Sequence, residues 1–353
     1  MKLIMPYVII FTLIAALVFS SCANTAENIE AIDDVSQGVN IYSGNWAVYD
    51  GNHIIFSDYP KGDVYTYNTS SDTTTLLFEG YHAYKLFICD GLVYFFNRSD
   101  ICVYRYSPED ETIVNVTDIF GDIWLIRDGV IYGRASNEKQ GEASRMLKYE
   151  ITTGEAAEIC VLDGNFKGFE GHRLAYSDST FYKALLTDTG VHNISVDLNG
   201  EMDQMEMLAD YNFSFVTKQY FYGSDEEGVF RINKNDEIYE CIVSDGQILG
   251  VDGERVFYAG MENGAYSLYV WQSDKSALLH SKYPLSNPSL FDNKFHILDD
   301  WVYFLSTENL QGGAIAEPVS VSAGTAVYHY AISIDTKELV LMHMSDLAYS
   351  SPD

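Results

Sequence analysis

The sequence predicts an all-β fold: a seven-bladed β-propeller, with four antiparallel strands per blade, after an N-terminal signal/lipobox segment. Three observations lead to this prediction. An apolar run, a turn dipeptide and an aromatic-rich run recur at intervals of 35 to 47 residues, which is a typical spacing of propeller blades. Short runs rich in β-branched and aromatic residues fill each repeat, and such residues favour strands. No sustained helical period follows residue 40.

The turn dipeptides mark the repeats. Aspartate before glycine favours a tight hairpin, because glycine, and aspartate to a lesser degree, tolerates a positive φ. The seven turns are Asp50-Gly51, Asp90-Gly91, Asp128-Gly129, Glu170-Gly171, Thr217-Lys218, Asp252-Gly253 and Asp299-Asp300.

The second repeat shows the strand pattern most clearly. Residues 85–89 form an apolar run, and residues 92–96 return after the Asp90-Gly91 turn. Residues 102–106 and 112–116 supply the third and fourth strands. The return strands of the other repeats are Ile54–Phe56, Val130–Tyr132, Leu174–Tyr176, Tyr220–Tyr222, Val256–Tyr258 and Val302–Phe304.

The number of blades and the closure of the ring leave alternatives. Consecutive short hairpins exclude parallel βαβ folds, which need long crossovers. A β-solenoid, a six-bladed ring with degenerate fourth and fifth repeats, and an eight-bladed ring stay open. Residues 338–344 could close blade seven with its own chain, or residues 39–42 could add an outer strand to it.

The N-terminus has the layout of an export signal. Lys2 is the only charge in residues 1–21, and Ile4–Phe19 is a nearly continuous apolar run. Cys22, directly after two serines, resembles the cysteine of a bacterial lipobox, although Phe19 stands where that motif usually has leucine. The resemblance implies cleavage before Cys22 and lipidation of its thiol. A signal peptide cut elsewhere and an uncleaved anchor are the alternatives.

These features divide the chain into three parts. Residues 1–21 are the predicted signal peptide, residues 22–40 the lipidated cysteine with an acidic tether, and residues 41–353 the propeller domain. The expected location is the extracytoplasmic face of the cell membrane, reached through the lipid anchor only, and the expected state is a monomer.

The charge excludes some partners. The chain has 51 acidic and 21 basic residues, and its net charge of −30 excludes nucleic-acid binding, because no basic patch offsets the acid. It also disfavours direct adhesion to anionic lipid headgroups. The segment Asp197–Asp203 comes nearest to a calcium loop but lacks the later glutamate, so no metal site is predicted.

The remaining cysteines are predicted to be free, buried thiols. Cys89 and Cys102 fall on the first and third strands of one repeat, and alternate strands lie about 9.5 Å apart, too far for a disulfide. Cys160 and Cys241 fall on the fourth strands of different repeats.

No catalytic motif and no cofactor motif occurs. Gly-x-Ser-x-Gly, His-Glu-x-x-His, Cys-x-x-Cys and phosphate-loop patterns are absent from the sequence. The eight histidines are scattered; among them, His329 alternates with two tyrosines and is expected at a blade interface or in solvent. Because a propeller can build a site from distant residues, enzymatic activity stays an alternative.

The second repeat also carries a family resemblance. The hairpin of residues 90–95 followed by the strand of residues 103–106 resembles a family of bacterial exported proteins of unknown function. Those proteins are described as similar to the β-propeller of low-density-lipoprotein-receptor-related proteins. The resemblance implies the fold, and it transfers no binding residue.

The sequence therefore favours a surface-anchored binding platform for a protein, peptide or glycan. The alternative is a propeller-type glycan-active hydrolase or lyase with carboxylates at the axial pocket. We expect the ligand on the face that carries the blade-to-blade connections, where loops are long and aromatic-rich. Tyr84, Phe120 and Trp124 could instead fill blade junctions. The candidate ligand-binding residues are Tyr81, His82, Tyr84, Asp122, Trp124 and Lys167.

Overall fold

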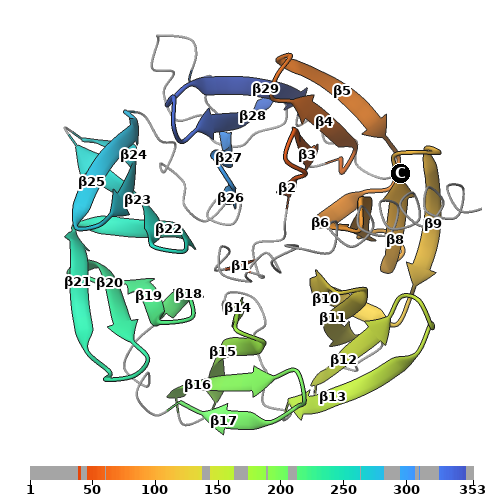
Figure 1. Cartoon of the computed structure of the whole chain (residues 1–353), viewed down its shortest axis with the longest axis horizontal. Coiled ribbons are helices and arrows are strands. Elements are labelled where there is room, and N and C mark those ends of the chain that lie inside the picture. The colour runs from red at the N-terminus through yellow and green to blue at the C-terminus, as the bar shows by residue number, and fades with distance from the viewer. Residues whose placement is uncertain are drawn as a thin grey trace, which may run out of the picture.

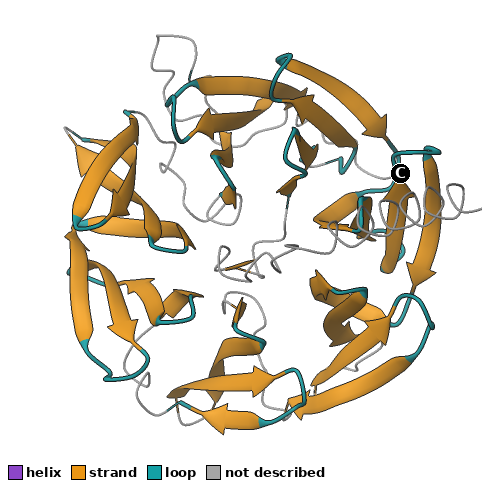
Figure 2. Ribbon diagram, viewed as in Figure 1, coloured by secondary structure: helices purple, strands orange, loops and turns teal. Residues whose placement is uncertain are grey.

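The protein is a ring of seven β-sheets. The structure is a computed structural model that describes residues 39–40, 46–59, 61–136, 144–162, 174–187, 190–205, 213–262, 264–281, 295–306, 310 and 326–346. These residues form strands and turns without a helix. Seven antiparallel sheets surround a central axis (Figures 1 and 2). The predicted seven-bladed β-propeller is confirmed, whereas the predicted signal peptide and Cys22 lie outside the described residues.

Each blade runs from an innermost strand near the axis to an outermost strand at the rim (Figure 1). Blade one contains β2 (Ala47–Tyr49), β3 (His53–Ser57), β4 (Val64–Asn68) and β5 (Thr73–Phe78). Blade two contains β6 (Ala83–Cys89), β7 (Leu92–Asn97), β8 (Cys102–Ser107) and β9 (Thr112–Thr117). Blade three contains β10 (Phe120–Arg127), β11 (Val130–Ala135), β12 (Ser144–Glu150) and β13 (Ala156–Leu162).

The other four blades repeat this plan. Blade four contains β14 (Leu174–Ser177), β15 (Thr180–Thr187), β16 (Gly190–Asp197) and β17 (Met202–Gln204). Blade five contains β18 (Phe213–Val216), β19 (Tyr220–Ser224), β20 (Gly228–Asn233) and β21 (Tyr239–Ser244). Blade six contains β22 (Gly246–Asp252), β23 (Arg255–Glu262), β24 (Ala265–Gln272) and β25 (Lys275–His280). Blade seven contains β26 (His296–Leu298), β27 (Trp301–Ser306), β28 (Ala326–Ser333) and β29 (Leu339–Asp346).

The core lies between the blades. The second strand of a blade is covered on both faces by its neighbours, so it is almost wholly apolar; in β7, five consecutive residues are buried. The outermost strand has one face in solvent, and three of the six residues of β9 are exposed. The largest fully buried side chains are Tyr222, Tyr303, Tyr330, Phe56, Phe95, Phe120, Phe181, Phe230, Phe257, Phe304, Ile54 and Leu86. Most of them are aromatic, as expected for packing between blades.

Polar side chains also link every pair of neighbouring blades. Each link joins a side chain on one blade to a backbone or side-chain group on the next. In ring order the links are Ser57 Oγ to Ala83 O at 2.7 Å, Lys85 Nζ to Asp122 Oδ1 at 2.7 Å, Arg127 to the Tyr176 hydroxyl at 2.8 Å, Lys234 Nζ to the Tyr182 hydroxyl at 3.0 Å, Ile248 N to Ser224 Oγ at 2.8 Å, Arg255 to Asp299 O at 3.1 Å, and Thr74 Oγ1 to Met342 O at 2.7 Å.

Blade seven closes the ring with its own four strands, β26 to β29. Of the two alternatives for ring closure, closure by the blade's own chain is confirmed, and Val39–Asn40 does not add an outer strand to blade seven. Instead, β1 (Val39–Asn40) pairs antiparallel with β14 of blade four, Val39 with Tyr176 and Asn40 with Ala175. Figure 1 shows β1 in the middle of the ring. The inner edge of β14 offers backbone groups without a neighbouring strand, and β1 takes up part of that edge.

The predicted strand order of blade four is wrong by one strand. Leu174–Tyr176, predicted as the return strand, belongs to the innermost strand β14, and the return strand is β15. The hairpin between them turns at Asp178 and Ser179, with φ of 50° and 61°. This turn lacks glycine, so the dipeptide pattern missed it. The predicted turn Glu170-Gly171 lies outside the described residues.

The four cysteines are free, as predicted, and lie on the predicted strands. The prediction that they are buried is wrong. Cys89, Cys102 and Cys160 are half-buried, and Cys241 is exposed. Cys160 and Cys241 belong to the outermost strands β13 and β21, whose rim side has no neighbouring blade to cover it.

Candidate functional site

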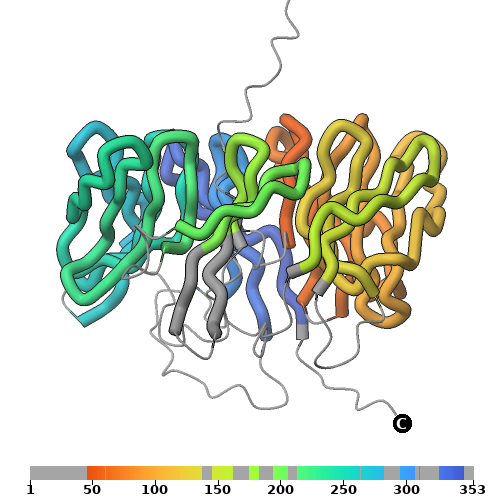
Figure 3. The backbone as a smooth tube through the Cα atoms, turned by 90° about the horizontal axis from the view of Figure 1, so that it is seen from below, coloured from red at the N-terminus to blue at the C-terminus, as the bar shows by residue number. Residues whose placement is uncertain are grey.

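The ring has two faces, which Figure 3 shows from the side. The turns that join first to second strands, and third to fourth strands, lie on one face, here called the turn face. The second-to-third-strand loops and the blade-to-blade connections lie on the opposite face, here called the connection face. This arrangement follows from the antiparallel strand order within each blade.

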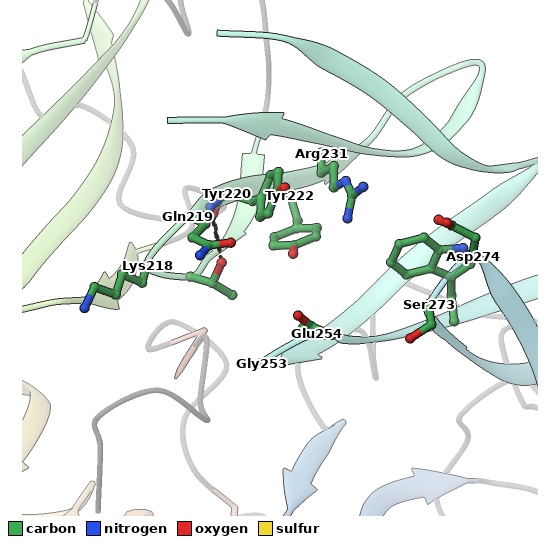
Figure 4. Close-up of a pocket in the computed structure, with 11 residues that line it drawn as sticks. Lys218, Gln219, Tyr220, Tyr222, Arg231, Gly253, Glu254, Ser273 and Asp274 are labelled. Atoms are coloured by element: carbon green, nitrogen blue, oxygen red, sulfur yellow. Dashed lines mark hydrogen bonds between the residues drawn. The ribbon is translucent and has the colours of Figure 1, made fainter. Parts of the chain in front are cut away.

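A pocket opens on the turn face between blades five and six. Its volume is about 360 Å³, within the range of cavities that hold small ligands. Three turns form its mouth, and strands β19, β20 and β24 supply its deeper wall (Figure 4). The lining residues are Thr217, Lys218, Gln219, Tyr220, Tyr222, Arg231, Gly253, Glu254, Trp271, Ser273 and Asp274.

Arg231 is the central charged group of the pocket. Its guanidinium carbon lies 4.7 Å from the centre of the Tyr220 ring and 5.2 Å from that of Trp271. Glu240 fixes the same group, with Nε at 2.7 Å from Oε2. Burial opposes a charged guanidinium, but the hydrogen bond and charge of Glu240 raise the pKa of Arg231 above its usual value. Arg231 is thus a permanent, positioned cation between two aromatic rings.

The rest of the pocket is mixed in polarity. Tyr222 is almost fully buried, and burial raises the pKa of its hydroxyl, so this group stays protonated and can donate a hydrogen bond. Lys218, Glu254 and Asp274 are exposed at the mouth. Aromatic carbon, a held guanidinium and hydroxyl groups together suit a ligand that combines a flat apolar surface with hydrogen-bonding oxygens.

Two of the predicted ligand residues are packing residues. Trp124 is 3% exposed, and its ring meets Phe181 of blade four edge-on at 6.0 Å. Tyr81 packs edge-on against Phe78, Phe95 and Tyr104, with centroids 5.5 to 6.0 Å apart. Both side chains fill the spaces beside blades.

Three other predicted residues lie near one another on the connection face. The Tyr84 ring lies between Trp46, whose centroid is 5.3 Å away, and the Arg98 guanidinium at 4.5 Å. Burial and the nearby charge of Asp122 raise the pKa of Tyr84 to about 12. His82 is exposed and has a φ of 44°. Lys167 lies outside the described residues.

Lys85 is a charged residue that the sequence patterns did not single out. It is buried, its Nζ lies 2.7 Å from Asp122 Oδ1, and it donates to Ile123 O at 3.1 Å. A lysine inside the apolar run of residues 85–89 was the available signal. Asp122 is therefore partly committed to an inter-blade ion pair.

The enzyme alternative has its best candidate in His329, a buried histidine that contacts both a carboxylate and a serine. His329 Nε2 lies 3.4 Å from Asp58 Oδ1 and 3.2 Å from Ser345 Oγ. A serine–histidine–aspartate triad needs the acid and the serine on opposite ring nitrogens, and here both face Nε2. His329 is also completely buried. This arrangement does not provide an accessible nucleophile.

The carboxyl group of Asp252 has a raised pKa. Burial raises the pKa most, Arg255 lowers it, and Asp299 and Asp300 raise it further. The side chain forms an ion pair with Arg255 where blade six meets blade seven, so it serves this blade contact. Within the described ranges no group of three or more histidine, cysteine, aspartate or glutamate residues could hold a metal ion. The part of the chain that is described also contains no helix long and apolar enough to cross a membrane.

Comparisons with known proteins show the fold. No family model and no curated protein matches the chain. A structure from a study of two prolyl endopeptidases is 12% identical with a TM-score of 0.55, and covers 88% of this chain and 52% of that chain. The acylaminoacyl peptidase of Pyrococcus horikoshii is 10% identical with a TM-score of 0.53, over 88% of this chain and 54% of that chain.

The β-propeller domain of the Trilobed protease from Pyrococcus furiosus is 10% identical with a TM-score of 0.47, over 88% of this chain and 98% of that chain. This chain thus spans about half the length of the two peptidases. At these identities the likeness extends to the propeller fold alone.

Proposed function

We propose that the protein is a lipid-anchored binding protein on the extracytoplasmic face of the membrane, and that its propeller presents the pocket between blades five and six to a protein, peptide or glycan. The pocket is the observation that carries this proposal. It combines a held cation, aromatic rings and hydroxyl groups in one cavity of about 360 Å³, and such combinations are typical of binding sites.

The chemistry of the pocket favours binding over catalysis. Arg231 is held by Glu240, so this acid is engaged in an ion pair. Glu254 and Asp274 sit at the exposed mouth. A glycosidase needs two carboxyl groups that face each other across the scissile bond, whereas the two acids of the pocket lining lie exposed on separate turns.

The lipid anchor is supported by the sequence. Cys22 follows an apolar run and two small residues, and the acidic composition suits a domain exposed outside the cell. Replacing Cys22 with Ala should abolish labelling by a fatty-acid analogue and release the protein from membranes. Equal labelling of the wild type and Cys22→Ala would contradict the lipid anchor but would leave the binding proposal unaffected.

The binding function is tested by screening the purified full chain on glycan and peptide arrays. A specific, saturable ligand is expected. Mass spectrometry of the recovered ligands checks the enzyme alternative, which requires shortened or modified products. Accumulation of such products with time would contradict the binding proposal and support the hydrolase or lyase alternative.

The residues predicted on the connection face remain a competing proposal for the ligand contacts. Of these, Asp122 lies close enough to Tyr84 to raise its pKa, and His82 is exposed in the connection just before Tyr84, whereas Tyr81 and Trp124 pack between blades. The turn-face pocket is preferred because it is a defined cavity.

A further inference from the structure

The contact between blades one and seven, here called the closing seam, buries a carboxylate. Asp58 follows β3 and is 1% exposed. Its Oδ1 lies 3.4 Å from Nε2 of His329 on β28, and its Oδ2 lies 3.8 Å from Nε2 of His343 on β29. The first and last blades of the ring therefore meet through two histidines and one acid.

The surroundings of His329 suit its charged form. Its Nδ1 lies 2.8 Å from the Tyr303 hydroxyl, and its Nε2 faces both Ser345 Oγ and Asp58. Each ring nitrogen thus faces an oxygen that can accept a hydrogen bond. Ser345 Oγ in turn donates to Tyr59 O at 3.1 Å, so the network continues from blade seven into the loop of blade one.

The other titratable groups around Asp58 do not supply a positive charge. On blade one, burial raises the pKa of Tyr65 most, and the negative charges of Asp58, Asp63 and Glu79 raise it further. On blade seven, burial followed by Asp58 raises the pKa of Tyr303 far above its usual value. His296 on β26 accepts a hydrogen bond from Trp46 N at 3.2 Å. His329 and His343 are therefore the groups placed to balance the charge of Asp58.

The effect on Asp58 is large. Burial by itself would raise the pKa of Asp58, but interactions with His329, His343 and Ser345 hold it far below its usual range. A carboxyl group with a depressed folded pKa stabilises the protein above its unfolded pKa of about 4 and loses this contribution as the pH falls further. The stability of the closing seam therefore depends in part on the charge of Asp58.

We propose that Asp58, His329 and His343 form a proton-controlled latch, which adds a charge-dependent contact to the apolar packing of the closing seam. Blade seven has its four strands without any from the N-terminal segment, and among the described strands no ladder crosses the closing seam. When Asp58 is neutral, the contacts that remain there include the apolar cluster that joins Trp46 and Phe56 of blade one to Tyr303 of blade seven, and the hydrogen bonds Thr74 to Met342 O and Trp46 N to His296. Neutralising Asp58 makes the contact between blade one and blade seven open more readily, while the other blades are unaffected.

The test is hydrogen exchange on the full chain, resolved by segment. Asp58→Asn should raise the opening of β2, β3, β28 and β29 about tenfold at pH 7, and leave β10 to β13 unchanged. Asp252→Asn is the matched control, because Asp252 is a buried acid at a different seam and its pKa is raised. It should leave the closing seam as in the wild type.

Two further measurements keep the proposal falsifiable if Asp58→Asn fails to fold. In the wild type, after correction for intrinsic rates, the seam strands should lose protection below about pH 4 before the other blades do. In the double variant Asp58→Asn with His329→Gln, the fold-increase in seam opening over the wild type should be about tenfold smaller than the product of the fold-increases in the two single variants. Uniform loss of protection in all blades, or seam strands in Asp58→Asn that match the wild type, would overturn the latch.

Discussion

Buried charged side chains between blades make large contributions to the stability of the blade contacts. Lys85 is fully buried, and burial lowers its pKa while Asp122 opposes that change. Asp122 is more accessible than its partner, with a side chain 24% exposed. If the ion pair is broken, water can therefore solvate the Asp122 carboxylate but not the Lys85 ammonium.

We predict that Asp122→Asn costs about 3 kcal/mol of unfolding free energy at pH 7, because it leaves the Lys85 ammonium buried without an anion. Lys85→Met should cost less than about 1 kcal/mol, since Asp122 can turn to water. Urea denaturation of both variants checks this order. A larger loss in Lys85→Met would show that the hydrogen bond to Ile123 O, and not the ion pair, holds the seam.

Lys234 gives a pH-dependent prediction. Its Nζ lies over the Tyr182 and Phe221 rings, at 4.4 and 5.0 Å, and burial lowers its pKa to about 8. Between that value and the unfolded pKa of about 10.4, the unfolded chain binds more protons, so stability rises with pH. The wild type should gain about 1 kcal/mol over Lys234→Met between pH 7 and pH 9.5. Parallel pH profiles of the two proteins would contradict the burial of the ammonium.

The thiols differ at the residue scale. Cys241 is exposed, whereas Cys160 is half-buried, and its burial raises the pKa of its thiol to about 11. Since the thiolate is the reactive form, a maleimide should modify Cys241 first and Cys160 at least about tenfold more slowly at pH 7. Peptide mapping after timed quenching measures both rates. Equal rates would mean that β13 opens readily at the rim.

At the scale of the strand, a bulge shapes the start of blade three. The register of β10 against β11 shifts between Phe120 and Asp122 and again between Ile123 and Leu125. Gly133 lies opposite this bulge, where a Cβ would collide with the Asp122 carbonyl oxygen and meet Phe120 Cδ1 at 2.9 Å. The bulge places Asp122 within reach of Lys85.

Gly133→Ala should therefore destabilise the protein by about 2 to 3 kcal/mol through overpacking. The control is Gly129→Ala, at a φ of 72° with no atom within 4 Å of an added Cβ, which should cost about 1 kcal/mol from backbone strain alone. Thermal unfolding compares the two variants. A smaller loss at Gly133 than at Gly129 would mean that the bulge relaxes.

The strand pattern was predictable where turn and strand signals coincide. In blade two the aspartate–glycine turn and apolar runs gave all four strands. In blade four the turn at Asp178 and Ser179 reaches positive φ without glycine, so the assignment slipped by one strand. The position of β1 beside β14 depends on contact between distant segments, which local patterns do not encode.

At the scale of the whole molecule, the ring brings together residues that no motif connects. Arg231 and Trp271 meet because blades five and six are neighbours, and Asp58 meets His329 because the first blade closes on the last. His329 was predicted at a blade interface or in solvent, and the interface is confirmed. The pocket could not be predicted from spacing, since three separate turns form its mouth.

The ring also separates two candidate surfaces. The predicted cluster around Tyr84 and His82 lies on the connection face, and the pocket around Arg231 lies on the turn face. Ligand binding can therefore be assigned to one face by single substitutions on exposed or partly exposed side chains that leave the blade cores intact.

The most direct test measures the affinity of the full chain for a ligand recovered from the array screen, by calorimetry, in the wild type, Arg231→Gln and His82→Ala. We expect Arg231→Gln to weaken binding about tenfold or more, because the guanidinium is the central fixed charge of the pocket. His82→Ala should leave affinity within about twofold. Unchanged affinity in Arg231→Gln together with a loss in His82→Ala would contradict the pocket and assign binding to the connection face.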